Sequence, residues 1–464
     1  MQIDQESVSV GAINQTPVFA DISGKRWEKI KYIFFAWAVL ILSLILLDVL
    51  QNKGLNNMII YMVLSIIDAL ILFTTVFSFI RLISFIFLSL KYTFHKKKNI
   101  ELSDKNLLVS IIISAYNEEN VICKTVDSIL NSTYENYEII IVNDGSTDNT
   151  SEVIKEKYKD NEYVTLIDKI NSGKSNSINL GIQQANGEII ILIDADTIMD
   201  NCAVANLVRH FKDKEVAAVS GNILVGNGNG FISRLQNIEY ITSLNFDKKA
   251  LAEINSINVV PGALGAWRLD YVKELDGFKM DTLAEDAELT LNLLSQKYTI
   301  KYDDEACAYT EVPENLKDLI KQRHRWCFGT LQCVWKNRHN IFKKSSGTLG
   351  WITLPYMIIS QCCLPLISVF LFPLCLLKYI FSGNCNIFLI NYILMLLVDY
   401  IIIFYSFVLG KNNKKDVGLV WAFRIFNKYF SAYILLKSLK SILLGSFVGW
   451  GKLKRTGNVR MVQA

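Results

Sequence analysis

Two carboxylates lie close together in the tripeptide Asp194-Ala195-Asp196, which directly follows the strand-like and mostly apolar segment 188–193. Carboxylate oxygens can hold one hard divalent ion, Mg²⁺ or Mn²⁺, and leave coordination sites for water and a diphosphate. An ion held there would neutralise the charge that grows on a phosphorylated leaving group. Aspartate is also common in turns, so the tripeptide alone equally fits a plain turn. The apolar run before it and the other acids along the chain favour the metal interpretation.

Two further charged residues lie upstream of this tripeptide. Asp144 lies in the segment 143–148, where its carboxylate could accept hydrogen bonds from a ribose or a base, although the same residues also form Asx-turns. Lys174 follows Gly173 and could meet a phosphate oxygen, or it could be a solvated surface lysine. The upstream glycine of a P-loop is missing, so the segment is not a Walker A motif.

A second pair of acids, Glu285 and Asp286, opens a helical pattern further along the chain. Asp286 could act as a general base that takes a proton from a hydroxyl nucleophile. Acids at the start of a helix also cap it and complement its dipole. The segment alone leaves both interpretations open.

The segment 322–326, Gln-Arg-His-Arg-Trp, combines an amide, a guanidinium and an indole. On a helix, Gln322, Arg325 and Trp326 share one face. The guanidinium fork suits a diphosphate, and the flat indole suits the apolar face of a sugar. Basic and aromatic residues also suit a helix at a membrane surface. Both interpretations can hold together, because the segment lies just before a long apolar run.

Alternating strand-like and helix-like segments must position these residues. The expected strands are 108–114, 138–142, 163–167 and 188–193, and the expected helices are 121–130, 151–158 and 176–186. This alternation predicts a doubly wound, mostly parallel α/β sheet. Ligands of such sheets bind at the carboxyl ends of the strands. Tyr116, Asp144 and the 194–196 turn all fall at those ends.

The charge of the chain is unevenly distributed. Residues 101–344 contain 36 of the 44 acidic residues but only 26 of the 48 basic ones, so an acidic middle lies between basic, apolar flanks. This composition excludes a disordered chain and a disulfide-rich secreted domain. The apolar flanks argue against a wholly soluble enzyme.

The flanks contain four apolar runs long enough to span a bilayer, at 33–50, 58–80, 351–380 and 387–409. Basic residues before the first run and after the second favour a cytosolic location for the acidic middle. Residues 417–448 are interrupted by basic residues, which favours an interfacial helix over a fifth span. Asp68 and Asp399 lie inside apolar runs, where a carboxylate either lines a polar path or joins two helices by a hydrogen bond.

The motifs together resemble the processive, membrane-integrated family-two glycosyltransferases, which include poly-N-acetylglucosamine, hyaluronan, chitin and cellulose synthases. The resemblance covers about residues 30–460, with AYNEE (115–119), NDGSTD (143–148), GKSNSIN (173–179), DAD (194–196), PGALGAWR (261–268), AED (284–286) and QRHRW (322–326). The segment GWGKLKRTG (449–457) looks like the poly-N-acetylglucosamine branch. Cellulose synthases have Thr-Glu-Asp where this chain has Ala-Glu-Asp, which weakens a cellulose assignment.

The resemblance implies an α/β domain of the GT-A type, Rossmann-like with a mostly parallel sheet, joined to an α-helical transmembrane region. It also implies residue roles. Tyr116, Glu118 and Asp144 would hold the nucleoside, Lys174 and Asp194 would help to place UDP, Asp196 would ligate Mg²⁺ or Mn²⁺, Asp286 would be the base, and Glu285, Gln322, Arg325 and Trp326 would contact the diphosphate and the acceptor sugar.

The expected division of the chain follows from the apolar runs and the motifs. It comprises a cytosolic tail (1–31), two transmembrane helices (32–90), a GT-A domain (101–300), interfacial helices with the QRHRW motif (301–348), transmembrane or interfacial helices (349–448) and a second cytosolic tail (449–464). The chain is expected in the plasma membrane with its catalytic domain in the cytoplasm.

The expected activity is an inverting, processive transfer from a UDP-sugar, with UDP-N-acetylglucosamine as the first choice of donor. The expected partners are the donor, the growing polysaccharide, the lipid bilayer and a small membrane or export protein, without nucleic acid. The alternatives are a hyaluronan, chitin or β-glucan synthase, a non-processive transferase with a lipid acceptor, and a glycan transporter without transferase activity.

Overall fold

A mixed eight-stranded sheet forms the centre of the protein, with the strand order β3-β2-β1-β4-β7-β6-β8-β5. The computed structural model describes residues 53–98, 107–227, 230–369, 379, 386–410, 414–446, 448, 457 and 459. The strands are β1 (Val109–Ala115), β2 (Tyr137–Asp144), β3 (Val164–Lys169), β4 (Ile189–Asp194), β5 (Thr197–Met199), β6 (Val216–Val225), β7 (Gly265–Arg268) and β8 (Thr299–Thr310). The domain boundary expected at residue 300 thus falls inside β8.

The four strands expected from the sequence are present as β1 to β4, and all three pairings among them are parallel. Their runs of β-branched residues are typical of strands that are buried on both faces. In the other half of the sheet β6 and β8 are again parallel, but β7 is antiparallel to both β4 and β6, and β5 is antiparallel to β8, which differs from the expected arrangement. The sheet is therefore mixed.

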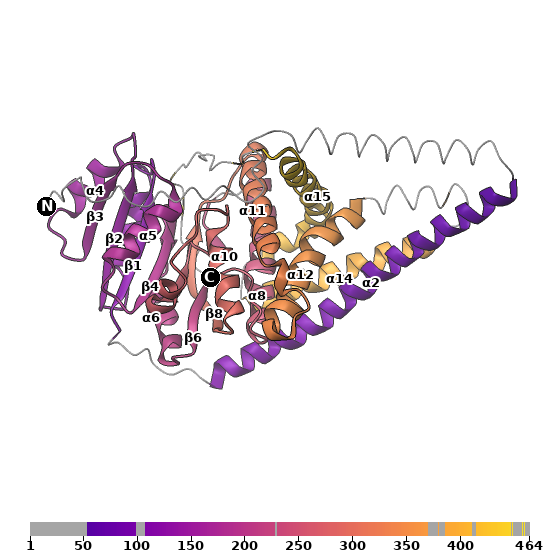
Figure 1. The fold of residues 1–464 in the computed structure, drawn as a ribbon, viewed down its shortest axis with the longest axis horizontal. Helices are drawn as coiled ribbons and strands as arrows, with labels where there is room; N and C mark the ends of the chain where they lie inside the picture. The colour runs from indigo at the N-terminus through magenta and orange to yellow at the C-terminus, as the bar shows by residue number, and fades with distance from the viewer. Residues whose placement is uncertain are drawn as a thin grey trace.

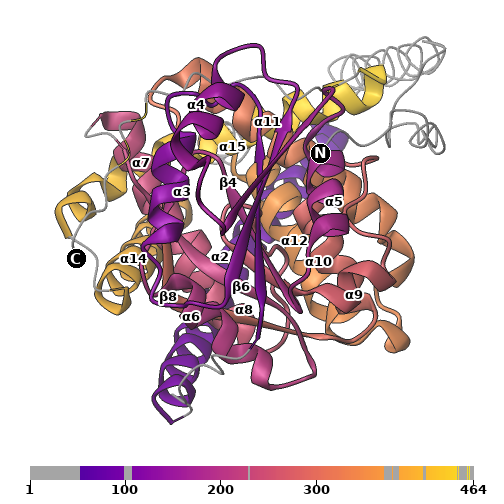
Figure 2. The same cartoon turned by 90° about the vertical axis from the view of Figure 1, so that its left-hand side faces the viewer.

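Helices cover both faces of the sheet (Figure 2), as a doubly wound fold requires. Alternate residues of β1 enter two different cores: Ile111 and Ile113 lie in one, and Ile112 lies in the other. The first core is covered by α3 (Ile122–Leu130), α4 (Thr150–Tyr158) and α6 (Ala203–Val208). The second is covered by α5 (Lys174–Gln184), α9 (Leu269–Glu274) and α10 (Glu285–Ser295).

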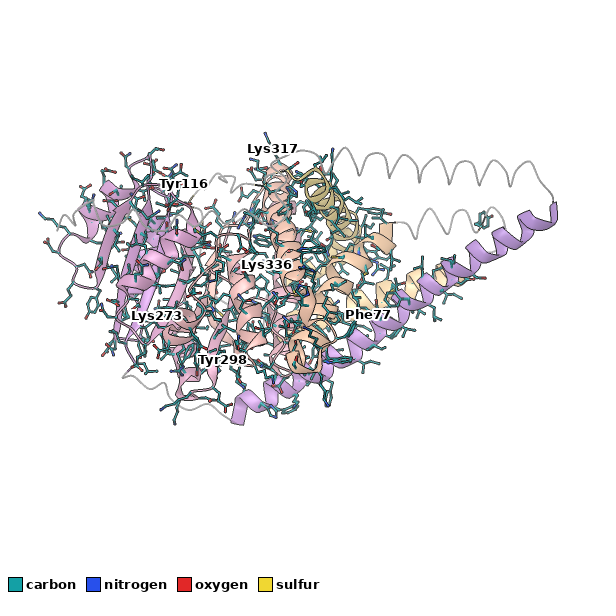
Figure 3. All side chains as sticks on the ribbon, viewed as in Figure 1. Phe77, Tyr116, Lys273, Tyr298, Lys317 and Lys336 are labelled. Atoms are coloured by element: carbon teal, nitrogen blue, oxygen red, sulfur yellow. The ribbon has the colours of Figure 1, made fainter. Side chains whose placement is uncertain are left out.

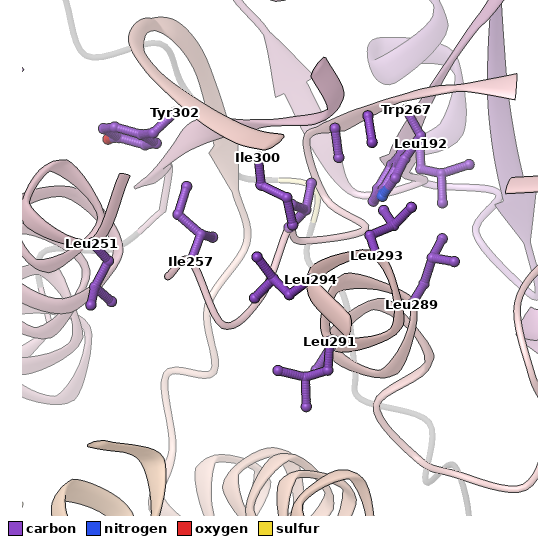
Figure 4. Close-up of a cluster of buried hydrophobic side chains, with 14 of the residues drawn as sticks. Leu192, Leu251, Ile257, Trp267, Leu289, Leu291, Leu293, Leu294, Ile300 and Tyr302 are labelled. Atoms are coloured by element: carbon purple, nitrogen blue, oxygen red, sulfur yellow. The ribbon is translucent and has the colours of Figure 1, made fainter. Parts of the chain in front are cut away.

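The core under α10 is continuous with the helical half of the molecule. Figure 4 shows Leu293 of α10 beside Leu192 and Trp267 of the sheet, all three of them buried. The same cluster includes Phe85, which comes from the long helix α2 (Lys53–Lys98). Burial of each such side chain stabilises the fold by about 1.5–3 kcal/mol. The helices therefore share the second of the two cores with the sheet.

The remaining helices gather on the side of the sheet along which α2 runs (Figure 1). They include α7 (Phe231–Glu239), the π-helix η2 (Tyr240–Phe246), α8 (Asp247–Ala252), α11 (Leu316–Lys336), the π-helix η5 (Leu349–Thr353), α12 (Leu354–Ile358), the π-helix η6 (Ile359–Cys363), α14 (Asn386–Leu409) and α15 (Val420–Leu444). Short 3₁₀ turns connect some of them: η1 (Arg209–Lys212), η3 (Arg338–Asn340), η4 (Lys344–Ser346) and η7 (Lys414–Leu419).

Within the described residues, two helical segments are long and apolar enough to cross a membrane, Asp68–Lys96 and Leu349–Val369. A shorter apolar helix covers Ile393–Leu409. The run 58–80 is helical as expected but belongs to the longer α2, while the run 33–50 lies outside the described residues. The division of the chain into spans and tails therefore stays a prediction.

A cluster of charged residues fixes the end of α2 to the sheet. Asp303 of β8 is fully buried, and its carboxylate accepts hydrogen bonds from Arg209 (2.9 and 2.6 Å) and from Lys96 of α2 (3.3 Å). His210 Nε2 lies 2.7 Å from the same carboxylate. These partners hold the pKa of Asp303 well below its usual range, although burial opposes them.

Candidate active site

Asp144 ends β2, and the strand register places it opposite Lys169, the last residue of β3. The two side chains form an ion pair, which was not expected from the sequence, although Lys169 lies only two residues beyond the expected third strand. The Asp144 carboxylate also accepts hydrogen bonds from the backbone N–H groups of Ser172 (2.9 Å) and Gly173 (2.9 Å). Asp144 therefore fixes the loop that leads into Lys174, rather than closing a turn within its own segment.

The loops that follow β1 and β2 are joined to each other. Asn117 has a left-handed backbone (φ 56°), and its side-chain oxygen accepts a hydrogen bond from the N–H of Thr147 (2.6 Å). The N–H of Glu118 donates to Thr150 Oγ1 at 2.8 Å. Tyr116 is 41% exposed beside these loops, at the edge of the sheet domain seen in Figure 3. Tyr116, Glu118 and Asp144 thus lie at one edge of the sheet, as expected from the ends of parallel strands.

Lys174, the first residue of α5, connects two separate parts of the chain. Its Nζ atom donates a hydrogen bond to Asp194 Oδ1 at 2.6 Å and lies 3.7 Å from Glu285 Oε1. Burial would lower the pKa of Lys174, but Asp194, Glu285 and Asp286 raise it above its usual value. Lys174 is therefore a charged residue of the site and not a solvated surface lysine.

Glu285 is buried at the first position of α10, with 4% of its surface exposed. Burial raises the pKa of its carboxyl group and the neighbouring Asp286 raises it further, whereas Lys174 and Arg325 act in the opposite direction. This interaction places the Arg325 charge near Glu285. Two cations from α5 and α11 thus flank a buried acid at the start of α10.

Asp286 follows Glu285, and two backbone N–H groups hold its carboxylate. Oδ1 accepts from Ala287 at 2.8 Å, as in the capping interpretation, and Oδ2 accepts from Gly262 at 3.2 Å. A Cβ atom on Gly262 would lie 3.4 Å from Lys174 Nζ, so this glycine lies between Asp286 and Lys174. The glycine belongs to the segment PGALGAWR, which sequence reasoning named without assigning it a contact.

Asp196 lies in the turn after β4, and 5% of its surface is exposed. Its Oδ1 accepts hydrogen bonds from Thr197 Oγ1 (3.2 Å) and Thr310 Oγ1 (3.5 Å). Among the described residues, no group of three or more His, Cys, Asp or Glu side chains could hold a metal ion. One or two carboxylates with substrate phosphates are the usual ligands of Mg²⁺, and the Asp194–Asp196 turn fits that pattern.

The QRHRW segment lies in α11, where Gln322 and Arg323 are both buried. Arg323 donates to Gln322 Oε1 (3.0 Å) and pairs with Glu239 of α7 (2.8 Å). Its guanidinium also lies 4.1 Å from the centre of the Trp326 ring, a cation–π contact. Trp326 packs against the core that contains Ala195 of the aspartate turn. Sequence reasoning missed Arg323, although its three-residue spacing from Trp326 is the signal for such a contact.

Helix α11 packs closely on the segment that precedes Asp286. A Cβ atom on Gly329 would lie 2.8 Å from the backbone nitrogen of Ala284 and from the carbonyl carbon of Leu283. Gln332 Oε1 accepts a hydrogen bond from the N–H of Leu283 at 2.9 Å. The position of Asp286 therefore depends on the helix that carries Arg325 and Trp326.

A cavity of about 330 Å³ lies away from these acids, between α2, η2, η6, α14 and α15. Hydroxyl and amide side chains line much of it: Thr74, Ser78, Thr242, Ser243, Ser360, Ser368, Asn427 and Ser431. Asp399 of α14 also lines the cavity and forms an ion pair with Arg424 of α15. The ion pair joins two helices, as the helix–helix interpretation of Asp399 expects, and the polar path stays a prediction.

Two family models match the chain. Glycosyl transferase family 2 matches residues 110–275, and the chitin synthase-like glycosyltransferase domain matches residues 274–339. The poly-beta-1,6-N-acetyl-D-glucosamine synthase of Staphylococcus epidermidis is 30% identical over 283 residues, which are 59% of this chain and 69% of that protein. The synthase of the same name from Staphylococcus aureus strain MSSA476 is 33% identical over 241 residues, 52% of this chain and 58% of the relative.

A solved structure shares the fold. The mannosyltransferase PcManGT from Pyrobaculum calidifontis, in complex with GDP-Man and Mn²⁺, superposes with a TM-score of 0.56 at 17% identity. The superposition covers 81% of this chain and 99% of that chain. The sheet and its helices thus have the GT-A-like arrangement expected from the sequence.

Proposed function

Because the chain belongs to the family-two glycosyltransferases, we propose that it polymerises a β-linked polysaccharide from a UDP-sugar, with UDP-N-acetylglucosamine as the donor. The printed names of the staphylococcal relatives support this choice of donor. The observation that carries the proposal is the bridge made by Lys174, which contacts both Asp194 at the end of β4 and Glu285 beside Asp286. One basic residue thereby joins the strand-end acids to the acids of α10.

Asp286 is the base in the proposed reaction. Its carboxylate takes the proton of an acceptor hydroxyl at the end of the growing glycan. The acceptor oxygen forms a bond to the anomeric carbon, the bond from that carbon to the diphosphate breaks, and UDP leaves with the bonding electrons. Attack opposite the leaving group inverts the configuration. The N–H groups of Gly262 and Ala287 donate hydrogen bonds to this carboxylate and hold its two oxygens in place.

The donor contacts lie on the side of Lys174 that faces Asp194, away from Glu285 and Asp286. Tyr116, Glu118 and Asp144 hold the nucleoside, while Lys174, Asp194 and Arg325 place the diphosphate. Asp196 would hold Mg²⁺ or Mn²⁺, which would neutralise charge on the leaving diphosphate.

The acceptor contacts come from α10, α11 and the helices around the cavity. Trp326, Gln322 and Glu285 hold the acceptor sugar beside the base. The hydroxyl-rich lining of the cavity suits a neutral polyhydroxylated chain and supports passage of the product between the helices. The proposed location of the protein is the plasma membrane, which it crosses several times, with its catalytic domain in the cytoplasm. The proposed partner is a small membrane or export protein.

Purified full-length protein incubated with UDP-N-acetylglucosamine and Mg²⁺ or Mn²⁺ tests the proposal. The expected result is UDP release with a matching amount of high-molecular-weight polymer that linkage-specific β-hexosaminidases degrade. UDP-glucose and GDP-mannose serve as competing donors. Release of UDP with only single-sugar products would indicate a non-processive transferase, and no release from any donor would contradict an active synthase.

A further inference from the structure

Lys336, the last residue of α11, joins two acids on either side of the proposed base. Its Nζ atom lies 3.0 and 2.8 Å from the carboxylate oxygens of Asp281 and also pairs with Glu288. Glu288 is 1% exposed and accepts a second hydrogen bond from Thr282 Oγ1 at 2.7 Å. These contacts tie the segment before Asp286 to the turn that follows it.

Asp286 and Glu288 belong to the same first turn of α10. A helical turn is held by backbone hydrogen bonds, so fixing Glu288 fixes the direction in which Asp286 points. The other end of the connection is α11, whose length separates Lys336 from Trp326 by about 15 Å at 1.5 Å per residue. Figure 3 shows Lys336 and Lys317 at the two ends of this helix.

We infer that Lys336 is a positioning residue, which with Glu288 and Asp281 holds the base Asp286 at a fixed place relative to Arg325 and Trp326. This inference rests on the proposed function, because it assigns the base to Asp286 and the acceptor to α11. Helix α11 thus carries the acceptor contact Trp326 in its middle and, through Lys336 at its end, holds the turn that contains the base. The acceptor hydroxyl and the base therefore meet in a set geometry.

The electrostatics of the connection suit a permanent contact. Burial lowers the pKa of Lys336, but Asp281 and Glu288 outweigh this and raise it above the usual lysine value. The ion pairs thus persist throughout the neutral range. Removing the lysine charge would leave Glu288 buried opposite a neutral side chain, and the first turn of α10 would move to relieve the unpaired charge.

The test compares Lys336→Met with Lys336→Arg and Glu288→Gln in the purified full-length protein. UDP release and sugar incorporated into polymer are measured in parallel over a range of UDP-N-acetylglucosamine concentrations. Lys321→Met is the matched control, because Lys321 also lies in α11 and forms an ion pair with Asp318 (3.0 Å) that does not contact the α10 region. Thermal unfolding of each variant is recorded beside the kinetics.

Lys336→Met is expected to lower kcat for polymer about 10- to 100-fold, because a misplacement near 1 Å has such an effect on a reacting geometry. The KM for the donor is expected to change less than about twofold, since Lys174 and Asp194 are untouched, and more of the UDP release should be unmatched by polymer. Lys336→Arg should recover most of the activity. Glu288→Gln should, like Lys336→Met, release UDP that is not matched by polymer.

Two results would overturn the inference while the wild-type protein remains active. The first is a Lys336→Met variant whose kcat, KM and ratio of UDP to polymer equal those of the control Lys321→Met. The second is a loss of kcat that only follows the folded fraction, with UDP release and polymer still matched, as a merely structural role predicts. If the wild type releases no UDP from any UDP-sugar, the proposed function fails instead.

Discussion

The donor side and the acceptor side of the proposed site are built in different ways. The donor side comprises Asp144, Lys174 and Asp194, which end a strand or begin a helix and are linked by contacts among themselves and the adjoining loop. The acceptor side comprises Asp286 and Trp326, which come from two helices whose spacing depends on close packing. The donor side is thus fixed by the sheet, and the acceptor side by contact between helices. Variants on the two sides should therefore fail in different kinetic parameters.

The largest effect is expected for Asp286→Asn on the acceptor side. Loss of the base should lower kcat by about 10²- to 10⁴-fold, the usual contribution of general base catalysis. UDP should still bind, because the contact between Lys174 and Asp194 is unchanged. Turnover measured by UDP release and binding measured by calorimetry separate the two quantities. Loss of UDP binding in this variant would assign Asp286 to the donor side and remove the contrast.

On the donor side, Asp144→Asn should raise the KM for the UDP-sugar and leave kcat less affected. The variant loses the ion pair with Lys169 and weakens the contacts to the loop before Lys174. Hydrogen bonds to charged groups contribute about 1.5–3 kcal/mol, so kcat/KM should fall roughly 10- to 100-fold. Asp127→Asn, which breaks an exposed pair with Lys157, is the control. A fall in kcat at constant KM would contradict the assignment.

Gly329→Ala tests whether helix packing sets the acceptor side. The new Cβ would lie 2.8 Å from backbone atoms of Leu283 and Ala284, so the segment before Asp286 must shift. A fall in kcat of about tenfold with unchanged donor KM is expected from such a displacement. Steady-state kinetics at saturating donor measure it. A variant that instead loses donor affinity would show that the two sides are not separately built.

The smallest effect concerns a second buried lysine, Lys248 of α8. Unlike Lys174, which donates to a carboxylate, Lys248 has a neutral hydrogen-bond partner. Its ammonium group donates to a neutral hydroxyl, Ser220 Oγ, at 2.8 Å. Burial lowers the pKa of Lys248 to about 7, although Asp286 acts in the opposite direction. Between this value and the usual lysine pKa the unfolded chain binds more protons than the folded one, so stability from this group rises with pH.

Lys248→Met should therefore raise the melting temperature by more at pH 6 than at pH 9. Differential scanning fluorimetry at the two pH values measures the difference. Lys249→Met is the matched control, because Lys249 pairs with Asp304 at 2.8 Å and its loss should destabilise the protein at both pH values. An equal change of melting temperature at pH 6 and pH 9 for Lys248→Met would contradict the low pKa.

The sequence predicted the strands that carry Asp144 and Asp194, because strand patterns are local. Strand runs of β-branched residues and the polar residues after them are visible in the chain, and parallel strands bring those ends together. The sequence analysis did not anticipate the antiparallel β7, since its four residues carry no pattern that sets direction. The contacts of Gly329 and Lys336 were likewise missed. They depend on which helix packs against which segment, and residue spacing within one helix does not encode that.

The long helix α2 has a practical consequence for the production of the sheet domain without its apolar helices. Phe85 and Tyr92 of this helix lie in the same buried cluster as Trp267 of the sheet, and Lys96 reaches the Asp303 carboxylate. A truncated fragment that began after residue 98 would lose those side chains. The apolar residues that they cover would then be exposed to water. We expect such a fragment to aggregate on expression. A fragment that keeps residues 82–98 would keep these core contacts and should stay in solution.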